Sequence, residues 1–228
     1  MRARARRMLL DLDEAALLEL AHLYCVWRVT RGATHTLNNA LTALAGLIEA
    51  PGDETLVDVE LERCARAARG LTAHHALRFG REEDAELTGL VRRTAALLGD
   101  SLGSRYALEV EIPADFFYLE ADPARVELLL LVLGYRLVDL SARGGRLRLG
   151  VAEGEKPASA CVELELLAGD LPEAAAESLF DPAAASGAGA ALALEAAGVI
   201  AAGCEVSLAA RRLPGGLRVR ALFPCAEA

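Results

Sequence analysis

Lysine is nearly absent from this 228-residue chain: Lys156 stands alone among 24 basic residues, the rest of which are arginines. Acidic residues number 33, so the formal net charge is -9. A nucleic-acid-binding protein needs a basic surface to neutralise phosphates, so this balance argues against nucleic acid as a partner. Aromatic residues make up only 4% of the chain, whereas hydrophobic residues reach 54%. The apolar content is therefore mostly aliphatic, and it is large enough for a folded core.

Paired cysteines and long apolar runs are also missing. The five cysteines (Cys25, Cys64, Cys161, Cys204 and Cys225) never form a Cys-x-x-Cys pair, so neither a zinc site nor a disulfide framework is expected. The run with the least charge, 182–204, is mostly Ala and Gly and has Glu195 near its middle, where an acid is costly in a bilayer. The apolar stretch after the basic N-terminus is too short for a secretory signal. We therefore expect a cytoplasmic protein with no membrane span.

Two helices joined by a turn are predicted over the first third of the chain. Apolar and small residues recur at alternating spacings of three and four along residues 13–50, a heptad pattern that packs helix on helix: Leu20, Leu23, Trp27, Thr30, Thr34, Leu37, Leu41, Leu44 and Ile48. Pro51-Gly52-Asp53 ends this helix, and a second stripe follows from Val57 to Arg78. One antiparallel hairpin buries one side of each helix. A second copy would complete a four-helix bundle, so a homodimer is expected.

The pattern changes after residue 81. Helices are expected over about 84–100, 122–141, 172–180 and 188–202, and strands over 106–112, 146–152, 160–167, 204–211 and 217–223. Strands mixed with helices indicate one sheet covered by helices. The chain is therefore predicted to be α+β: a helical hairpin over 1–81, followed by an α/β sandwich over 82–228.

His35 is the most informative candidate for chemistry. On a helix it lies about 200° from Leu37, on a face shared with Arg28, Arg31, Asn38, Asn39 and Thr42. A solvent-facing imidazole with cations beside it can act as a nucleophile toward phosphorus. The alternative is a surface histidine without a role, and spacing alone leaves both open. The hairpin geometry would also bring Arg66 and Arg69 toward His35.

His74 and His75 form a second candidate. His75 falls on the predicted stripe of the second helix, where a packed histidine is the default, and His74 would face solvent. A metal-binding pair on a helix needs a spacing of three or four residues, which neighbours do not provide. No metal site is expected here.

The segment His35-Thr36-Leu37-Asn38-Asn39 resembles the phosphoacceptor motif of sensor histidine kinases, which reads His, acid, any residue, Asn, and Asn or Pro. Later segments resemble, in the same order, the gyrase/Hsp90-like ATP-binding domain of that family. Asp122-Pro123-Ala124-Arg125 resembles the start of its nucleotide-box helix, Phe180-Asp181-Pro182 its Phe-Glu-Pro, and 187–194 its second glycine box. The resemblance implies a dimerisation and histidine phosphotransfer hairpin followed by an ATPase-like domain.

Several residues differ from that family's motifs at positions that bind ATP or its metal. The two nucleotide-box asparagines correspond to Val132 and Arg136, neither of which can hold Mg²⁺. The strand end before Asp170 has no acid for the adenine, and the second glycine box keeps Gly187 and Gly189 but has Ala at its third glycine. The segment between the glycine boxes is too short for an ATP lid. Thr36 replaces the acid expected to act as base. ATP-driven autophosphorylation is therefore not expected.

The resemblance is greatest to dimeric phosphorelay histidine phosphotransferases that have lost ATP binding. It implies that His35 accepts a phosphoryl group from a receiver-domain aspartate and passes it to another receiver, with Asn39, Thr42 and Arg31 positioning or stabilising the group. No cofactor is expected, and Mg²⁺ would be carried by the receiver. The expected partners are response-regulator receivers, with a sensor kinase as a further candidate. The alternatives are a non-catalytic pseudokinase scaffold and a receiver phosphatase, with a true kinase as the least favoured.

Overall fold

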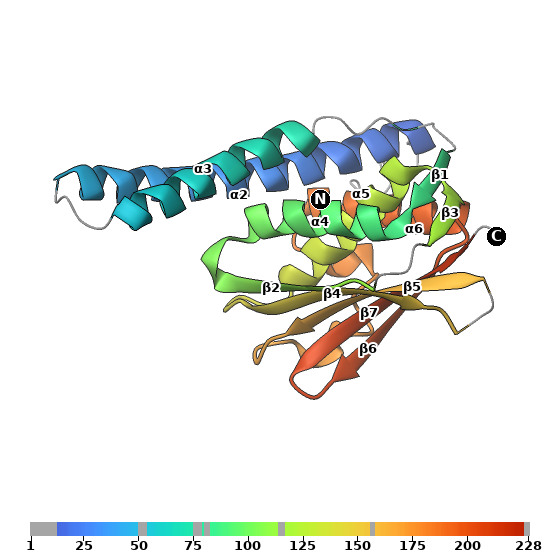
Figure 1. The fold of residues 1–228 in the computed structure, drawn as a ribbon. Coiled ribbons are helices and arrows are strands. Elements are labelled where there is room, and N and C mark those ends of the chain that lie inside the picture. The colour runs from blue at the N-terminus through green and yellow to red at the C-terminus, as the bar shows by residue number, and fades with distance from the viewer. Residues whose placement is uncertain are drawn as a thin grey trace.

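A helical hairpin is joined to an α/β sandwich in the computed structural model, which describes residues 13–49, 54–74, 79, 83–113, 117–155 and 158–225 (Figure 1). The hairpin consists of α2 (Glu14–Glu49) and α3 (Glu54–His74). The helices of the sandwich are α4 (Leu87–Leu102), α5 (Pro123–Val138) and α6 (Ala188–Gly203). Its strands are β1 (Glu83–Glu86), β2 (Tyr106–Glu111), β3 (Tyr118–Ala121), β4 (Gly145–Glu153), β5 (Ser159–Leu167), β6 (Ser207–Leu213) and β7 (Gly216–Pro224). The predicted α+β class and the order of its parts are confirmed.

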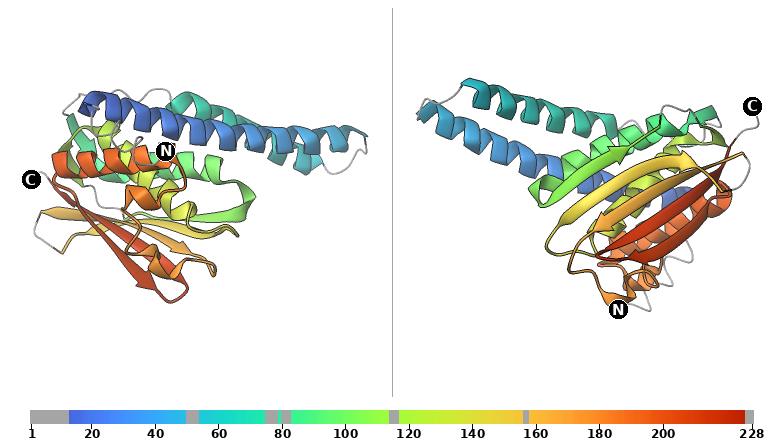
Figure 2. Two further views of the ribbon diagram at one scale, coloured as in Figure 1. Left: turned by 180° about the vertical axis from the view of Figure 1, so that it is seen from behind. Right: turned by 60° about the horizontal axis from the view of Figure 1, so that its bottom comes forward.

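The main sheet has five strands in the order β2-β4-β5-β7-β6. Strands β2 and β4 are parallel and the other neighbours are antiparallel. Helices α4, α5 and α6 cover one face, as the views in Figure 2 show. The other face carries cross-strand ion pairs, such as Arg218 with Glu165 at 2.9 Å and Arg148 with Glu109 at 3.3 Å. Glu165 is buried, whereas Arg148 and Glu109 are partly exposed, and an exposed pair of this kind adds little stability.

Helix α5 lies at the centre of the core. Asp122 caps its start by accepting a hydrogen bond from the Ala124 amide at 2.9 Å, and Pro123 occupies its first turn. Nearly every residue from Ala124 to Val138 is buried, because the sheet lies on one side of the helix and α2, α4 and α6 pack around it. A helix enclosed on all sides needs an apolar sequence around its whole circumference, which explains the long leucine run in this segment.

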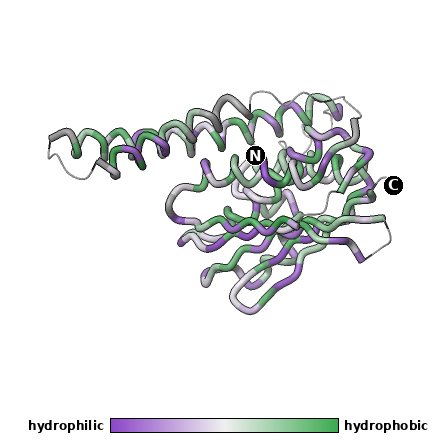
Figure 3. Tube along the Cα trace, in the orientation of Figure 1, coloured by the Kyte–Doolittle hydropathy of each residue, from purple (hydrophilic) through white to green (hydrophobic). Residues whose placement is uncertain are grey.

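Helix α2 belongs to both parts of the molecule. It begins with Asp13, whose carboxylate accepts a hydrogen bond from the Ala16 amide at 2.8 Å. Its first half lies across α4 and α6, so that the helices form two layers above the sheet, and its second half projects beyond the sandwich with α3 (Figures 1 and 2). Hydrophobic residues recur along the length of the projecting hairpin in Figure 3. The helix therefore connects the sandwich core to the hairpin.

The buried stripe of α2 differs from the predicted one. Buried residues toward the sandwich are small or aliphatic and include Leu18, Ala21, Cys25, Val29 and Ala33. The predicted heptad stripe lies on another face: Leu20, Leu23 and Trp27 are 40%, 54% and 52% exposed. The helix carries two apolar stripes, and the periodicity alone did not tell which one packs within the chain. Leu41 of the heptad stripe is also exposed, whereas Leu37 and Leu44 are half-buried.

Some predicted elements have different bounds in the structure. The segment predicted as a helix over 84–100 begins with strand β1, which pairs with β3, a strand that the sequence did not predict. The helix predicted over 172–180 is only a short 3-10 turn, Glu173–Ala175. The turn at Pro51-Gly52-Asp53 and Lys156 lie outside the described residues. The predicted division between 81 and 82 also falls among undescribed residues, and it stays a prediction.

Candidate functional site

His35 lies in the middle of α2, and its side chain is exposed. Its Nε2 atom is 3.3 Å from the Nδ2 atom of Asn39, one turn further along the helix. The Asn39 amide nitrogen can only donate, so in this contact Nε2 of a neutral ring is the acceptor and the proton is on Nδ1. An exposed ring nitrogen whose lone pair is released when this contact breaks can act as a nucleophile.

The other predicted residues lie on turns of α2 before and after His35 and have different partners. Thr42 is exposed, and its hydroxyl donates to the carbonyl of Asn38 at 2.8 Å rather than to the imidazole. Arg31 is exposed one turn before His35, and its guanidinium carbon is 5.5 Å from the centre of the Trp27 ring. Arg31 is therefore free to contact an anion at His35, whereas Thr42 is already engaged with the backbone.

A cleft of about 890 Å³ opens beside His35, between α2 and the sandwich. Helix α2 contributes Arg28, Arg31 and His35 to its lining. The sandwich contributes residues from three places, namely the end of α4 with the following turn, the end of α5, and the start of α6: Ser101, Leu102, Gly103, Arg105, Asp139, Ser186, Gly187, Gly189 and Ala190. Three arginines against one aspartate make the lining basic, although the whole chain is acidic.

Arg28 lies on the same face of α2 as His35, as predicted, but its side chain is only 18% exposed. Its Nη1 atom donates to both carboxylate oxygens of Asp139 at 2.9 Å and to the Tyr24 hydroxyl at 2.9 Å. The guanidinium also lies over the Tyr135 ring, 4.5 Å from its centre. Burial alone would lower the pKa of Arg28, but the hydrogen bond and charge of Asp139 raise it above its ordinary value. The helical projection placed Arg28 on the correct face but did not show that the sandwich packs against it.

The positions that correspond to the nucleotide-box asparagines are occupied by residues with structural contacts. Val132 is 2% exposed and packs in the core. Arg136 is 5% exposed, and its guanidinium donates to the carbonyl oxygens of Leu179 and Ser178, each at 2.9 Å. Desolvation by burial lowers the pKa of Arg136. Neither residue lines the cleft beside His35.

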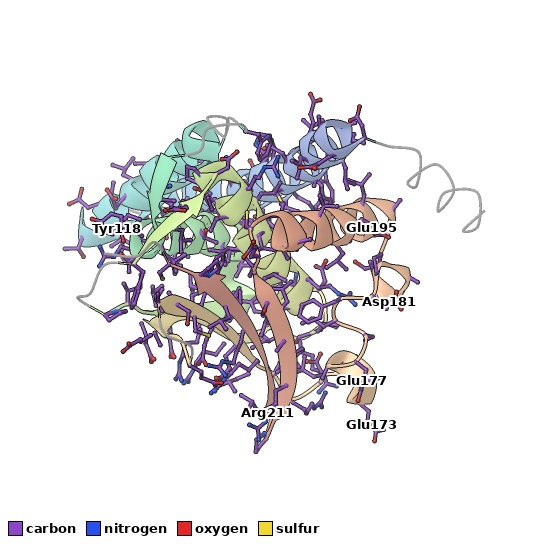
Figure 4. The ribbon with its side chains drawn as sticks, turned by 90° about the vertical axis from the view of Figure 1, so that its right-hand side faces the viewer. Tyr118, Glu173, Glu177, Asp181, Glu195 and Arg211 are labelled. Atoms are coloured by element: carbon purple, nitrogen blue, oxygen red, sulfur yellow. The ribbon has the colours of Figure 1, made fainter. Side chains whose placement is uncertain are left out.

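The segment between β5 and α6, residues 168–187, follows the surface (Figure 4). Its exposed residues Glu173, Glu177 and Asp181 point outward, while Arg136 holds its backbone from inside. Asp170, the late acid of the first glycine box, accepts hydrogen bonds from the Ser141 hydroxyl at 2.6 Å and from the amides of Ala142 and Arg143 at 3.0 Å. Asp170 therefore fixes a neighbouring loop.

The remaining glycines of the second box lie at the start of α6. Gly187 precedes the helix, and Gly189 lies against the Tyr24 ring: a Cβ atom at Gly189 would be 2.8 Å from that ring. Both glycines line the cleft. The close approach to α2 is thus one reason for glycine at position 189 in this chain.

Several candidates cannot be placed. Arg66, Arg69 and His74 belong to α3, but their side chains lie outside the described residues, and His75 lies outside them entirely. All five cysteines are free, with Cys25 and Cys161 buried. In the part of the chain that the structure describes, no three His, Cys, Asp or Glu side chains are grouped to hold a metal ion. Nor does any described helix combine the length and apolar character that a membrane span requires.

Two charged residues of the cleft were missed from the sequence. Asp139 follows α5 and pairs with Arg28 across 111 residues of sequence. Arg105 ends a short turn before β2. A lone acid just after an apolar helix was a weak signal for Asp139, whereas nothing in the local sequence distinguishes Arg105 from other surface arginines.

Comparison with known proteins identifies the fold. No protein-family profile and no curated protein sequence matches the chain. A solved structure of a bacterial phosphotransferase matches with a TM-score of 0.57 and 15% identity, over 92% of this chain and 96% of that one. Full-length ShkA in complex with AMPPNP matches with a TM-score of 0.54 and 15% identity, over 95% of this chain and 47% of that one. The mycobacterial sensor histidine kinase MprB matches with a TM-score of 0.54 and 16% identity, over 65% of this chain and 100% of that one.

The chain therefore has the fold of a histidine kinase-like core, as its sequence motifs predicted. At these identities the likeness concerns the fold.

Proposed function

We propose that this protein is a phosphorelay histidine phosphotransferase of two-component signalling, which transfers phosphoryl groups between receiver-domain aspartates through His35 without binding ATP. The observation that carries the proposal is the contrast between two positions. His35 is exposed beside a basic cleft, whereas the residues that would hold the nucleotide and its metal are a buried valine and a buried arginine bonded to backbone.

The proposed transfer is an in-line displacement. The Nε2 lone pair of His35 attacks the phosphorus of a receiver aspartyl-phosphate, the Nε2–P bond forms, and the P–O bond to aspartate breaks, releasing the carboxylate. The Asn39 amide, which contacts Nε2 at 3.3 Å, leaves the nitrogen and donates to a phosphoryl oxygen instead. Arg31 supplies positive charge. A second receiver aspartate then reverses the step, and the receiver provides Mg²⁺ in both directions.

A homodimer is part of the proposal. The heptad stripe of α2 is exposed at Leu20, Leu23 and Trp27, and α3 exposes Leu56 and Val59 by 50% and 57%. A soluble helical hairpin rarely leaves so many large apolar side chains in water, and a second hairpin would cover them. The likeness in fold to a bacterial phosphotransferase over most of both chains also supports this function.

The test uses two phosphodonors. Incubation with labelled phosphoramidate, a small donor, and with phosphorylated receivers from the same genome should give acid-labile, base-stable label on this chain. The label should disappear in His35→Gln and persist in His22→Gln, which changes another histidine of the same helix.

Other outcomes would contradict the proposal. Loss of receiver phosphate without label on this chain would favour the phosphatase, and binding without any change in phosphate would favour the scaffold. A rise in melting temperature with Mg²⁺-ATP, or label from ATP, would show that a nucleotide binds after all.

A further inference from the structure

The contact between α2 and the sandwich is unusually close in the turns before His35. A Cβ atom at Gly32 would lie 2.3 Å from the carbonyl oxygen of Ser101, at the end of α4. On the other side, Tyr24 packs against Gly189 at the start of α6. The buried stripe of α2 is part of the same apolar cluster as the sandwich core. Helix α2 therefore packs between α4 and α6, so closely that only glycine fits at Gly32 and at Gly189.

Among the residues that the structure describes, two ion pairs link α2 to the sandwich: Glu14 with Arg125 at 2.7 Å at the first turn of α2, and Arg28 with Asp139 beside the cleft. Arg28 binds Asp139 through both carboxylate oxygens at 2.9 Å, and the two side chains are only 18% and 17% exposed. The Tyr24 hydroxyl and the Tyr135 ring enclose the guanidinium from α2 and α5. Ser186, just before α6, approaches Asp139 with its hydroxyl at 3.5 Å. A single charged group of α2 thus contacts the end of α5 and lies near the start of α6.

The position of this pair relates it to His35. Arg28 and His35 are seven residues apart, so they lie about 10 Å apart along the helix axis and on nearly the same side. Both line the cleft, whose opposite wall comes from the sandwich. A rotation or tilt of α2 on the sandwich would therefore change what His35 faces, and a partly buried, directional ion pair opposes such a motion.

We propose that Arg28 and Asp139 are positioning residues that fix the phosphoacceptor helix on the sandwich, so that a receiver meets His35 and the sandwich wall of the cleft as one preformed surface. This inference rests on the proposed function. Helix α5, which carries Val132 and Arg136, then serves to hold α2 and not to bind a nucleotide.

The Arg28–Asp139 pair should affect the docking of a receiver and not the phosphotransfer step at His35. A preformed surface lowers the cost of association, because the partner does not have to order two mobile parts. Loss of the pair should therefore raise the KM for a phosphorylated receiver and leave kcat nearly unchanged. Phosphoramidate needs no docking surface, so its reaction with His35 should not change. A merely destabilised protein would show no such difference between donors.

The test compares Arg28→Gln, Asp139→Asn and the double variant with wild type. We expect KM for the receiver to rise about tenfold in each single variant and no further in the double variant, because the two residues act as a unit. The phosphoramidate rate should stay within about twofold of wild type. Hydrogen–deuterium exchange should be faster in the end of α4 and the first turn of α6, which measures the contact without any phosphotransfer.

The control is Glu127→Gln, which breaks a similar pair inside the sandwich, Arg93 with Glu127 at 3.1 Å between α4 and α5. It should leave both the receiver KM and the exchange at the α2 contact unchanged. Additive effects in the double variant, equal losses with both donors, or unchanged exchange would overturn the inference. Absence of His35 label in wild type from either donor would instead overturn the proposed function, while the exchange result would still decide whether the pair fixes α2.

Discussion

Substituting Gly32 by alanine is the most direct test of the close packing of α2 against α4. The residue lies in the interior of the helix, where alanine is normally preferred over glycine by about 1 kcal/mol. At this position, however, the added methyl group would lie 2.3 Å from the oxygen and 2.4 Å from the Cα atom of Ser101. Both atoms are backbone, so the end of α4 has to move, and Arg28 one turn away has to move relative to Asp139.

Whether Gly32→Ala raises or lowers the free energy of unfolding depends on which of two effects is larger, the cost of overpacking or the gain in helix propensity. Overpacking of a close contact costs about 1–3 kcal/mol, and more where backbone has to shift. Because backbone has to shift here, the cost should be in the upper part of this range, about 2–3 kcal/mol, so after the gain of about 1 kcal/mol in helix propensity Gly32→Ala should lower the free energy of unfolding by about 1–2 kcal/mol. For a chain of this size that corresponds to a fall in melting temperature of roughly 2–8 °C.

Gly46 provides the matched control in the same helix. A Cβ atom at Gly46 would have no atom within 4 Å, so Gly46→Ala should stabilise the protein by about 1 kcal/mol. Both variants are measured by urea denaturation at one protein concentration, because the proposed dimerisation would make stability depend on concentration. If Gly32→Ala is as stabilising as Gly46→Ala, α2 does not approach α4 as described, and the reasoning about its close packing fails.

Three further predictions concern other parts of the molecule. Arg136→Ala removes two hydrogen bonds from a charged donor to backbone carbonyls, and urea denaturation should show a loss of about 2–4 kcal/mol with no gain in ATP binding. The hydrogen bond from Ser141, with those from two amides, lowers the pKa of Asp170 in the folded protein. Its contribution to stability is therefore present above the ordinary carboxyl pKa of about 3.9 and is lost as the pH falls through the lowered value. The difference in unfolding free energy between wild type and Asp170→Asn, followed from about pH 7 to about pH 3, should shrink in that range; a constant difference would contradict the assigned contacts. Burial raises the pKa of Cys25 to about 12, so peptide mapping of the folded protein after alkylation at about pH 8 should find Cys25 unmodified while the half-exposed Cys64 reacts.

The helices and strands that have a regular spacing of apolar residues and Pro or Gly at their ends could be predicted from the sequence. The apolar run of α5 begins at an Asp-Pro pair that caps the helix as expected, and the strands of the main sheet follow the alternation of residues. Strand β3 was missed because four residues are too few to show a period. The 3-10 turn at 173–175 was taken for a helix because alanine favours helices wherever it occurs.

The residues of the site differ in how far a single sequence could place them. The exposure of His35 follows from the helical period, since it depends on one helix. The orientation of Arg28 does not, because it depends on Asp139, which lies 111 residues away. The same is true of the two stripes of α2: Leu20 and Cys25 each belong to a regular apolar pattern, and only the packed structure tells which faces the sandwich. Contacts between distant segments are absent from a single sequence.

Helix α2 packs both against the sandwich and against α3, and this double packing affects how the chain folds. The buried residues of α2 between Leu17 and Val29 belong to the same apolar cluster as the sheet and α5, while α2 also packs against α3. A cut near residue 82 would separate α2 from the sandwich. The fragment after the cut would then expose the faces of α4 and α6 that α2 covers in the whole chain. The hairpin and the sandwich are thus not interchangeable modules, and the whole chain should unfold in a single cooperative transition in place of two.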